Sequence, residues 1–245
     1  NFMEYNPLAN VDDGSCSAPA TIGCMDPLFH EYNPLANVDD GSCQYLAGCT
    51  SDDTVTYDDT DYSLVTIGLQ CWFSENLNTS KYNNGDDIPN IQDVGEWAST
   101  YQNETGAWSY FNNDPDYSWG GPSYTKLYNQ FAVHDSRLLC PSGWHVPSST
   151  DWNVLTALLG GSGAGYFMKA DYGWGEVSSY QGSNSSGFTG LPGGLRKSDG
   201  EFTDYTRGYF WSSNQNTGRR LDTSNDVNNF WNGDVHGLSV RCLRD

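Results

Sequence analysis

Seven cysteines are the residues of this 245-residue chain with the most definite chemistry, at positions 16, 24, 43, 49, 71, 140 and 242. None forms the C-x-x-C pair that typically ligates zinc. The four histidines are dispersed along the chain, at positions 30, 134, 145 and 236, so a mixed cysteine and histidine metal site is not expected. Oxidation to disulfides explains the cysteines better, and it predicts an oxidising compartment.

The favoured disulfide pairing is Cys24 with Cys43, Cys49 with Cys71, and Cys140 with Cys242. Bonds from Cys16 to Cys24 and from Cys43 to Cys49 would close equally plausible short loops, and sequence alone does not choose between the arrangements. The bond from Cys140 to Cys242 would close a loop of about 100 residues, for which the chain-entropy model gives roughly 4.7 kcal/mol. The favoured pairing leaves Cys16 over, and we expect it to take part in assembly.

A tandem repeat opens the chain. The thirteen residues EYNPLANVDDGSC run from Glu4 to Cys16 and recur unchanged from Glu31 to Cys43, with a period of 27 residues. The second copy is preceded by a segment that begins at Gly23, whereas the first copy lacks this opening half. We expect a neighbouring molecule or an upstream segment to complete the first copy. The alternative is that residue 1 marks a proteolytic cut.

Each copy of the repeat carries side-chain oxygens beside a turn-forming glycine, and hard oxygen ligands suit Ca²⁺. The candidate calcium ligands are Asn10, Asp12, Asp13, Asn37, Asp39 and Asp40. The repeats resemble the acidic, cysteine-bearing thrombospondin type 3 repeats of secreted proteins, and this resemblance implies calcium binding. The alternative is a turn in which Asn and Asp side chains hydrogen-bond their own backbone.

The charge balance restricts the partners of the protein. Against 31 acidic side chains stand 11 basic ones, giving a formal net charge of -20. Phosphate backbones and anionic membrane surfaces repel such a chain, so nucleic-acid binding is not expected. No run approaches the roughly 20 apolar residues that cross a bilayer, so we expect no membrane insertion. With the predicted disulfides, this favours a secreted, extracellular or cell-surface protein.

The elements that must position these groups are short. Ser148 and Asp151 form a variant capping box before a helix with Trp152, Leu155 and Leu158 on one face. Strands are expected over residues 63–67, 71–73, 208–212 and 238–243, the last alternating as a half-buried strand does. The pattern predicts an α+β domain with short strands, one clear helix and long loops.

Seven blocks in the second part of the chain carry a family resemblance. They are QCWFSENLN from Gln70, KLY from Lys126, CPSGWHVPSSTDW from Cys140, NSSGF from Asn184, LPGG from Leu191, FWSS from Phe210 and GLSVRC from Gly237. Together they resemble the Fibrobacter succinogenes major paralogous domain of secreted and surface proteins in Bacteroidota, and more distantly the C-type-lectin-like fold. The resemblance implies a compact C-type-lectin-like domain over residues 49–245, preceded by small disulfide-closed repeats over residues 1–48. It implies no general activity.

The tryptophans divide by context. Those inside the blocks, Trp72, Trp144, Trp152 and Trp211, are expected to anchor the core. The other five lie in loops rich in Gly and Asn, where an exposed aromatic side chain is more often a contact residue. We expect these five to contact glycans: Trp97, Trp108, Trp119, Trp174 and Trp231.

Four positions match patterns for carrying a glycan. Asn78, Asn103 and Asn184 each begin an N-x-[ST] triplet. Asp53, Thr54 and Val55 match the D-[ST]-[AILVMT] O-glycosylation pattern of Bacteroidota. Thr54 is the favoured position because we place it in the linker between the repeats and the large domain.

No G-x-S-x-G nucleophile elbow is present, and paired carboxylates in so acidic a chain are expected to form a solvated surface. We therefore expect a non-enzymatic structural or adhesive subunit of the bacterial cell surface or extracellular matrix. It would form homo-oligomers or filaments, assembled head to tail through the N-terminal repeats. The alternative is a glycan-binding adhesion module on a calcium-stiffened stalk.

Overall fold

The computed structural model describes residues 20–25, 33–41, 49, 53–117, 125–175, 180–231 and 236–245, with only the backbone described at Trp231. The chain divides into two compact units, Asn1–Ala47 and Gly48–Asp245. In the first unit, β1 (Ile22–Gly23) pairs in parallel with β2 (Val38–Asp39). Cys24 follows β1, is buried and is disulfide-bonded. Its predicted partner Cys43 lies outside the described residues, so this pairing stays a prediction.

The large unit contains three sheets, and two of them have five strands. The first has the order β3-β4-β5-β15-β8, with bounds Thr54–Tyr57, Thr60–Ile67, Gln70–Phe73, Leu243–Arg244 and Trp144–His145. The second has the order β10-β9-β14-β7-β6, with bounds Phe202–Thr203, Leu195–Arg196, Gly237–Leu238, Lys126–Asn129 and Trp108–Tyr110. All pairs in both sheets are antiparallel.

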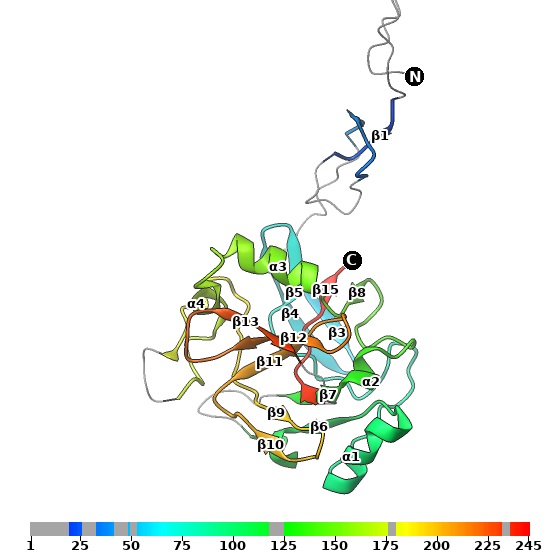
Figure 1. Ribbon diagram of the computed structural model, residues 1–245, viewed down its shortest axis with the longest axis vertical. Helices are drawn as coiled ribbons and strands as arrows, with labels where there is room; N and C mark the ends of the chain where they lie inside the picture. Colours follow the sequence, from blue (N-terminus) through cyan, green and yellow to red (C-terminus); the bar gives the residue numbers. More distant parts are fainter. Residues whose placement is uncertain are drawn as a thin grey trace, which may run out of the picture. The chain divides into compact units, whose positions relative to one another are not determined.

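The third sheet is an antiparallel meander of β11 (Gly208–Trp211), β12 (Thr217–Leu221) and β13 (Val227–Trp231). It crosses the front of the large unit in Figure 1. Local sequence explains the hairpins. Between β3 and β4, Asp58 and Asp59 both have positive φ angles, as a two-residue turn that matches the strand twist requires.

The predicted helix is confirmed as α3 (Ser149–Leu158), and the capping box is complete. The Ser148 side chain accepts the Asp151 N–H, and the Asp151 carboxylate accepts the Ser148 N–H at 2.7 Å. The prediction for Leu158 is wrong, because this side chain is 51% exposed. Six residues after Trp152, it lies about 120° from that side chain around the helix, whereas Leu159 returns to the buried face.

The large unit contains more helix than the single clear helix that we predicted. The other helices are α1 (Val94–Asn103), α2 (Gln130–Val133), α4 (Ala164–Met168) and the short 3-10 helix η1 (Phe111–Asn113). The ten-residue α1 lies at the opposite end of the large unit from α3 in Figure 1. It was missed because Trp97 and Thr100 are its only buried residues, too few for an apolar stripe. The mixture of helices and predominant strands is an α+β fold.

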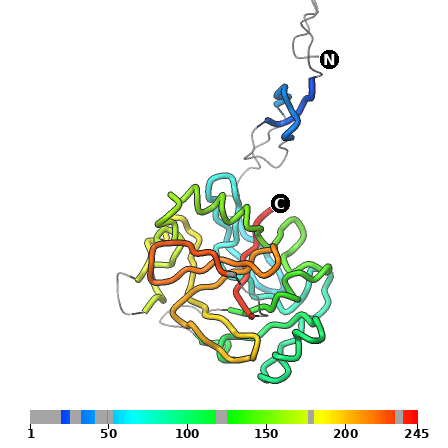
Figure 2. The backbone as a smooth tube through the Cα atoms, viewed as in Figure 1, coloured from blue at the N-terminus to red at the C-terminus, as the bar shows by residue number. Residues whose placement is uncertain are grey.

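The predicted strand over residues 238–243 is wrong as a single element. β14 pairs with β7 and β9 in one sheet, whereas β15 pairs with β5 and β8 in another. The residues between them, Ser239 to Cys242, are all buried and connect the two sheets. We call residues 239–242 the crossing segment. Figure 2 traces it in red, beside the cyan β3–β5 region.

Aromatic residues and disulfides hold the core together. The four tryptophans predicted as core anchors are buried, and the rings of Trp72 and Trp152 lie 5.1 Å apart. The predicted bonds Cys49–Cys71 and Cys140–Cys242 are both present. The second bond joins the crossing segment to the residues just before β8. Among the described residues, no helix is long and apolar enough to cross a membrane.

Candidate functional site

Buried basic side chains are the distinctive polar feature of the large unit. Five of the chain's 11 basic residues are buried: Lys126, Lys169, Arg196, Arg219 and Arg241. Among the described residues, no Asp or Glu is buried to the same degree. Burial lowers the pKa of all five, to about 10 for Arg196 and to about 9 for Arg241. Such groups must therefore find strong internal acceptors.

Their acceptors are backbone carbonyls of loops and turns. Lys126 donates to the Asn78 carbonyl at 2.7 Å. Lys169 donates to two carbonyls in the turn after β12, those of Asp222 at 3.1 Å and Ser224 at 2.9 Å. Arg196 donates to the carbonyls of Ile91, Gln92, Asp93 and Gly200. These three cations thus hold loop and turn segments, whereas Arg219 bonds the Ser149 carbonyl and the Asn153 side chain of α3.

Arg241, in the crossing segment, has the most complete set of acceptors. Its Nε donates to Asn76 Oδ1 at 2.7 Å, and its Nη2 donates to the Thr189 carbonyl at 2.9 Å. Its Nη1 donates to the carbonyls of Phe73, at 3.1 Å, and Phe188. The guanidinium carbon also lies 4.3 Å from the centre of the Phe188 ring. Arg241 therefore holds β5, the loop after β5 and residues 188–189 at one point.

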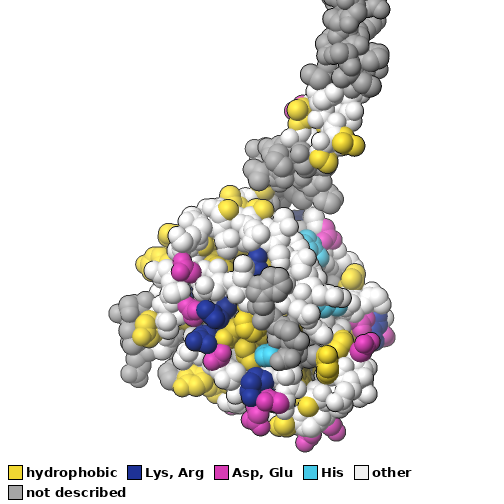
Figure 3. All heavy atoms as spheres, viewed as in Figure 1, with side chains coloured by type: hydrophobic (Ala, Val, Ile, Leu, Met, Phe, Trp, Pro, Cys, Tyr) yellow, Lys and Arg dark blue, Asp and Glu magenta, His cyan; other side chains and the backbone are white. Residues whose placement is uncertain are grey.

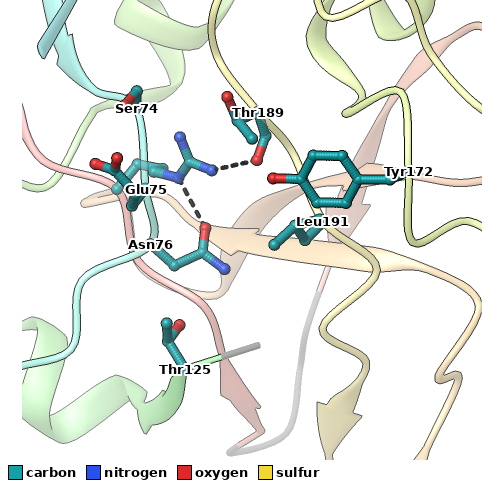
Figure 4. A pocket seen from close by; sticks show the side chains of 8 residues that line it. Ser74, Glu75, Asn76, Thr125, Tyr172, Thr189 and Leu191 are labelled. Atoms are coloured by element: carbon teal, nitrogen blue, oxygen red, sulfur yellow. Dashed lines mark hydrogen bonds between the residues drawn. The ribbon is translucent and has the colours of Figure 1, made fainter. Parts of the chain in front are cut away.

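A small cavity of about 140 Å³ lies beside Arg241 (Figure 4). Its lining residues are Ser74, Glu75, Asn76, Thr125, Tyr172, Thr189, Leu191 and Arg241. The Tyr172 hydroxyl points toward the guanidinium in Figure 4. The Glu75 carboxylate accepts the Ser63 N–H at 3.0 Å, and Asn76 Nδ2 donates to Ser239 Oγ at 3.2 Å. The cavity is smaller than the several hundred Å³ usual for ligand pockets, and Glu75, Asn76 and Arg241 in its lining have internal partners.

Comparison with models of known families identifies the family of the chain. The model of the Fibrobacter succinogenes major domain matches residues 65–244. The chain belongs to this family. No curated protein and no solved structure matches the chain. Two of the buried cations, Lys126 and Arg241, stand inside blocks by which we recognised the Fibrobacter succinogenes major domain.

The prediction that loop tryptophans contact glycans is wrong for three of the five residues. Trp97, Trp108 and Trp174 are buried in this Fibrobacter succinogenes major domain. Their indole N–H groups donate to the backbone carbonyls of residues 197, 88 and 190, at 3.0, 2.9 and 3.1 Å. Trp119 and the side chain of Trp231 lie outside the described residues.

The physical reason is that each of these tryptophans packs against a buried cation. The Arg196 guanidinium carbon lies 4.3 Å from the centre of the Trp97 ring. Lys126 Nζ lies 4.4 Å from the Trp108 ring, and Lys169 Nζ lies 5.3 Å from the Trp174 ring. The attraction between cation and ring is stronger when the pair is removed from water, and it offsets part of the cost of burying the charge. Of these three cations only Lys169 lies between two apolar residues, Met168 and Ala170, so the local sequence gave little signal for the pairs.

A second charged group that sequence analysis missed surrounds His145. Its Nδ1 lies 2.6 Å from Asp245 Oδ1, and its Nε2 lies 3.5 Å from Asp151 Oδ2, in the capping box of α3. The Asp151 carboxylate, with help from Asp245, raises the pKa of His145 against the effect of burial. This group ties β8, α3 and the residue after β15 together. The Ser148 hydroxyl donates to the Asp151 carboxylate at 2.7 Å.

Three of the calcium candidates, Asn37, Asp39 and Asp40, are described, and two of them accept hydrogen bonds from the backbone of the repeat unit. Asn37 Oδ1 accepts the Thr21 N–H at 2.8 Å, and Asp39 Oδ1 accepts the Gly41 N–H at 3.0 Å. These contacts agree with the turn alternative. Within the described parts of the chain, no three His, Cys, Asp or Glu side chains are grouped as metal ligands. Asn10, Asp12 and Asp13, like Cys16, lie outside the described residues, and calcium binding stays a prediction.

The four glycosylation candidates lie in different surroundings. Asn184 bonds Thr189 through both ends of its carboxamide, at 3.1 and 2.8 Å. The Asn78 side-chain oxygen is buried, whereas Asn103 is exposed at the end of α1. Thr54 is exposed but belongs to β3, where it pairs with Ser63, so its placement in a linker is wrong.

Proposed function

We propose that the protein is a non-enzymatic structural or adhesive subunit, secreted and held at the cell surface or in the extracellular matrix. The observation that carries this proposal is the use of the buried polar groups. Arg241, Lys126 and three of the buried tryptophans, Trp97, Trp108 and Trp174, bond backbone carbonyls, so they stabilise long loops. The two described disulfides support secretion, since such bonds persist in oxidising compartments.

The ionisable groups also favour a role without catalysis. A general acid needs a carboxyl pKa raised toward neutral pH, usually by burial. For every described carboxyl group with a shifted pKa, the shift is downward. For Asp151, hydrogen bonds from His145 and Ser148 outweigh the opposing effect of burial. The carboxyl groups with shifted pKa values thus favour the ionised form, which does not suit a general acid.

We also propose that the large unit is a variant of the C-type-lectin-like fold. In support, α3 follows the W-x-x-P block that begins at Trp144, and β11 ends at Trp211 in the W-S-S block. The V-R-C block that begins at Val240 leads into β15. An experimental structure checks this proposal. Superposition with a known C-type-lectin-like domain should pair these elements in the same order and direction, and a different order of strands would refute it.

Assembly rests on the cysteine count. Seven cysteines cannot all pair within one chain, and the two described bonds of the large unit use four of them. We propose that Cys16 bonds Cys24 of a neighbouring copy in place of that copy's own bond from Cys24 to Cys43, which gives a head-to-tail contact and leaves Cys43 as the seventh, unpaired thiol. Contacts of this type build filaments when they do not close into rings. Calcium bound by the repeat oxygens would stiffen such a chain of units.

Electron microscopy and sedimentation of the full chain under oxidising conditions test the assembly. We expect filaments or a ladder of oligomers that a reducing agent disperses. Cys16→Ser should abolish them, whereas the neighbouring substitution Ser17→Ala should leave them unchanged. Dispersed monomers of the unmodified chain would refute self-assembly. Substrate turnover by the purified chain would refute the non-enzymatic role.

A further inference from the structure

Two aromatic side chains of α4 reach the surface of the large unit. Tyr166 is 42% exposed and Phe167 is 39% exposed. Their ring centres lie 5.6 Å apart, and the ring planes form an angle of 73°. Figure 3 shows hydrophobic side chains at the surface over α4. Exposure of apolar rings to water is unfavourable, and a partner that covers them removes this cost. Adjacent exposed aromatic residues therefore indicate a contact site.

The backbone beneath these rings is held firmly. Ser183 N donates to the Tyr166 carbonyl at 2.8 Å, and Ser186 Oγ donates to the Phe167 carbonyl at 2.8 Å. On the opposite side, a Cβ atom at Gly165 would lie 2.7 Å from the Asn225 carbonyl, so the helix packs closely there. A rigid site loses little conformational entropy when it binds.

Hydroxyl groups adjoin the two rings. Ser183 Oγ donates to Ser185 Oγ at 3.0 Å, and Ser185 is exposed. With Ser186 and the phenol of Tyr166, these groups supply donors and acceptors without a charge. We call Tyr166, Phe167, Ser183, Ser185 and Ser186 the α4 platform. It combines apolar faces with neutral hydroxyls.

We propose that the α4 platform binds a neutral polysaccharide, with an apolar face of a pyranose ring on Tyr166 or Phe167 and sugar hydroxyls bonded to the serines. A sugar ring presents the same combination of apolar faces and neutral hydroxyls. The net charge of -20 repels anionic glycans, and a cationic partner would require a carboxylate that the platform lacks. This inference gives the adhesive part of the proposed function a ligand, and it rests on that function.

The size of the platform argues against a second copy of the chain as its partner. An aromatic side chain buries at most about 150–250 Å². Two partly exposed rings therefore supply far less than the roughly 800 Å² per partner of a stable protein interface. A single sugar unit needs no more than one or two rings.

An array of neutral and charged glycans, probed with the full chain in the presence of a chelator, tests the inference. We expect binding to neutral hexose or pentose polymers that does not depend on metal ions. Tyr166→Leu and Phe167→Leu keep an apolar side chain but remove the aromatic face, so each should weaken binding about tenfold. Matched controls are Tyr101→Leu and Tyr205→Leu, at residues 59% and 47% exposed, which should bind as the unmodified chain does.

Near-UV circular dichroism and thermal unfolding establish that each variant is folded. Failure of the unmodified chain to bind any neutral glycan overturns the inference. Equal binding by the folded leucine variants also overturns it. If these variants instead lose self-association of the chain, the platform is a contact between copies. A chain that forms filaments but binds no glycan keeps the proposed function and loses this inference.

Discussion

The Arg241 guanidinium shows how this protein accommodates a buried charge. Four backbone or side-chain oxygens accept its hydrogen bonds, from segments distant in sequence. A planar group with five N–H donors can bond several fixed oxygens at once, whereas an ammonium group has three donors at one point. Arg and Lys are therefore not equivalent at this position.

Arg241→Lys should lower the free energy of unfolding by about 2–4 kcal/mol, because at least one buried carbonyl loses its donor and the stacking on Phe188 is lost. Urea unfolding followed by tryptophan fluorescence measures this effect. The control Arg207→Lys alters an exposed ion pair with Asp204 and should change the value by about 0.5 kcal/mol or less. Equal losses in the two variants would contradict the proposed importance of the Arg241 contacts.

His145 makes stability depend on pH. Its pKa is raised in the folded protein, first by the Asp151 carboxylate and then by Asp245. The folded state therefore holds the proton more tightly than the unfolded state, whose histidine pKa is about 6.5. The resulting stabilisation is complete below about pH 6.5 and is lost as the pH rises through the folded pKa.

Urea unfolding at several pH values from about 5 to about 9 tests this linkage. The free energy of unfolding should fall as the pH rises above about 6.5, and His145→Gln should remove this fall. In Asp245→Asn the fall should be smaller and should end at lower pH, because the histidine loses one of its two carboxylates and its folded-state pKa moves toward the unfolded value. A His145→Gln variant with the unmodified pH profile would refute the assignment.

Sequence analysis predicted individual residues well where the chemistry was local. The capping box follows from Ser148 and Asp151, and the two described disulfides agree with the favoured one of the pairings that the cysteines allowed. The three loop tryptophans were wrongly predicted because their burial depends on Arg196, Lys126 and Lys169. Trp97 and Arg196 lie about a hundred residues apart, and no local pattern reports such a contact.

At the scale of elements, the crossing segment determines how the sheets are joined. The Trp211 N–H donates to the Ser239 carbonyl, the Leu77 N–H to the Val240 carbonyl and the Phe73 N–H to the Cys242 carbonyl. The alternating pattern around Val240 predicted a half-buried strand, but Ser239 and Arg241 are buried as well. An alternation of apolar and polar residues cannot show that loop carbonyls will surround the polar ones.

Strands of two residues, such as β8, β9 and β15, were equally beyond prediction. Two residues contain no period, so alternation gives no signal. These strands form because the rest of the fold presents a partner, as His145 and Trp72 do for Leu243. In contrast, the eight residues of β4 alternate between buried and exposed positions over much of their length, which explains why most of it was predicted.

The disulfide Cys140–Cys242 fastens the crossing segment beside β8, across 102 residues of sequence. Replacing both cysteines by serine should lower the free energy of unfolding by about 3–5 kcal/mol, and more than the same change at Cys49 and Cys71, whose loop is shorter. Guanidinium unfolding without reductant measures both variants. A larger loss from the Cys49 and Cys71 pair would contradict the expected dependence on loop length.

For the whole molecule, burial of the five cations shifts the surface toward negative charge. At most six basic side chains remain to face the solvent among 31 acidic ones. On the face shown in Figure 3, basic side chains lie beside acidic ones. The ion pairs include the exposed pair Lys197–Asp199 and the partly buried pair Arg220–Asp222. The remaining surface carboxylates repel one another and oppose compaction.

Sodium chloride should therefore stabilise the full chain. Between about 10 mM and about 150 mM salt, we expect the free energy of unfolding to rise on the order of 1 kcal/mol, because screening weakens the repulsion. Thermal unfolding at a fixed pH measures this rise. Calcium chloride at the same ionic strength tests the repeat sites: a further gain that Asp39→Asn diminishes would support them. Stability that falls with sodium chloride would contradict the repulsion argument.

The crossing segment also has a consequence for the order in which the protein folds. Residues 239–242 contact β5, the loop after it and β11, all of which leave the ribosome earlier. Contacts so distant in sequence form late and slowly. A nascent chain that stops before residue 239 lacks the guanidinium and the second cysteine that close its interior. We therefore expect the large unit to complete its fold only after residues 239–242 have been synthesised.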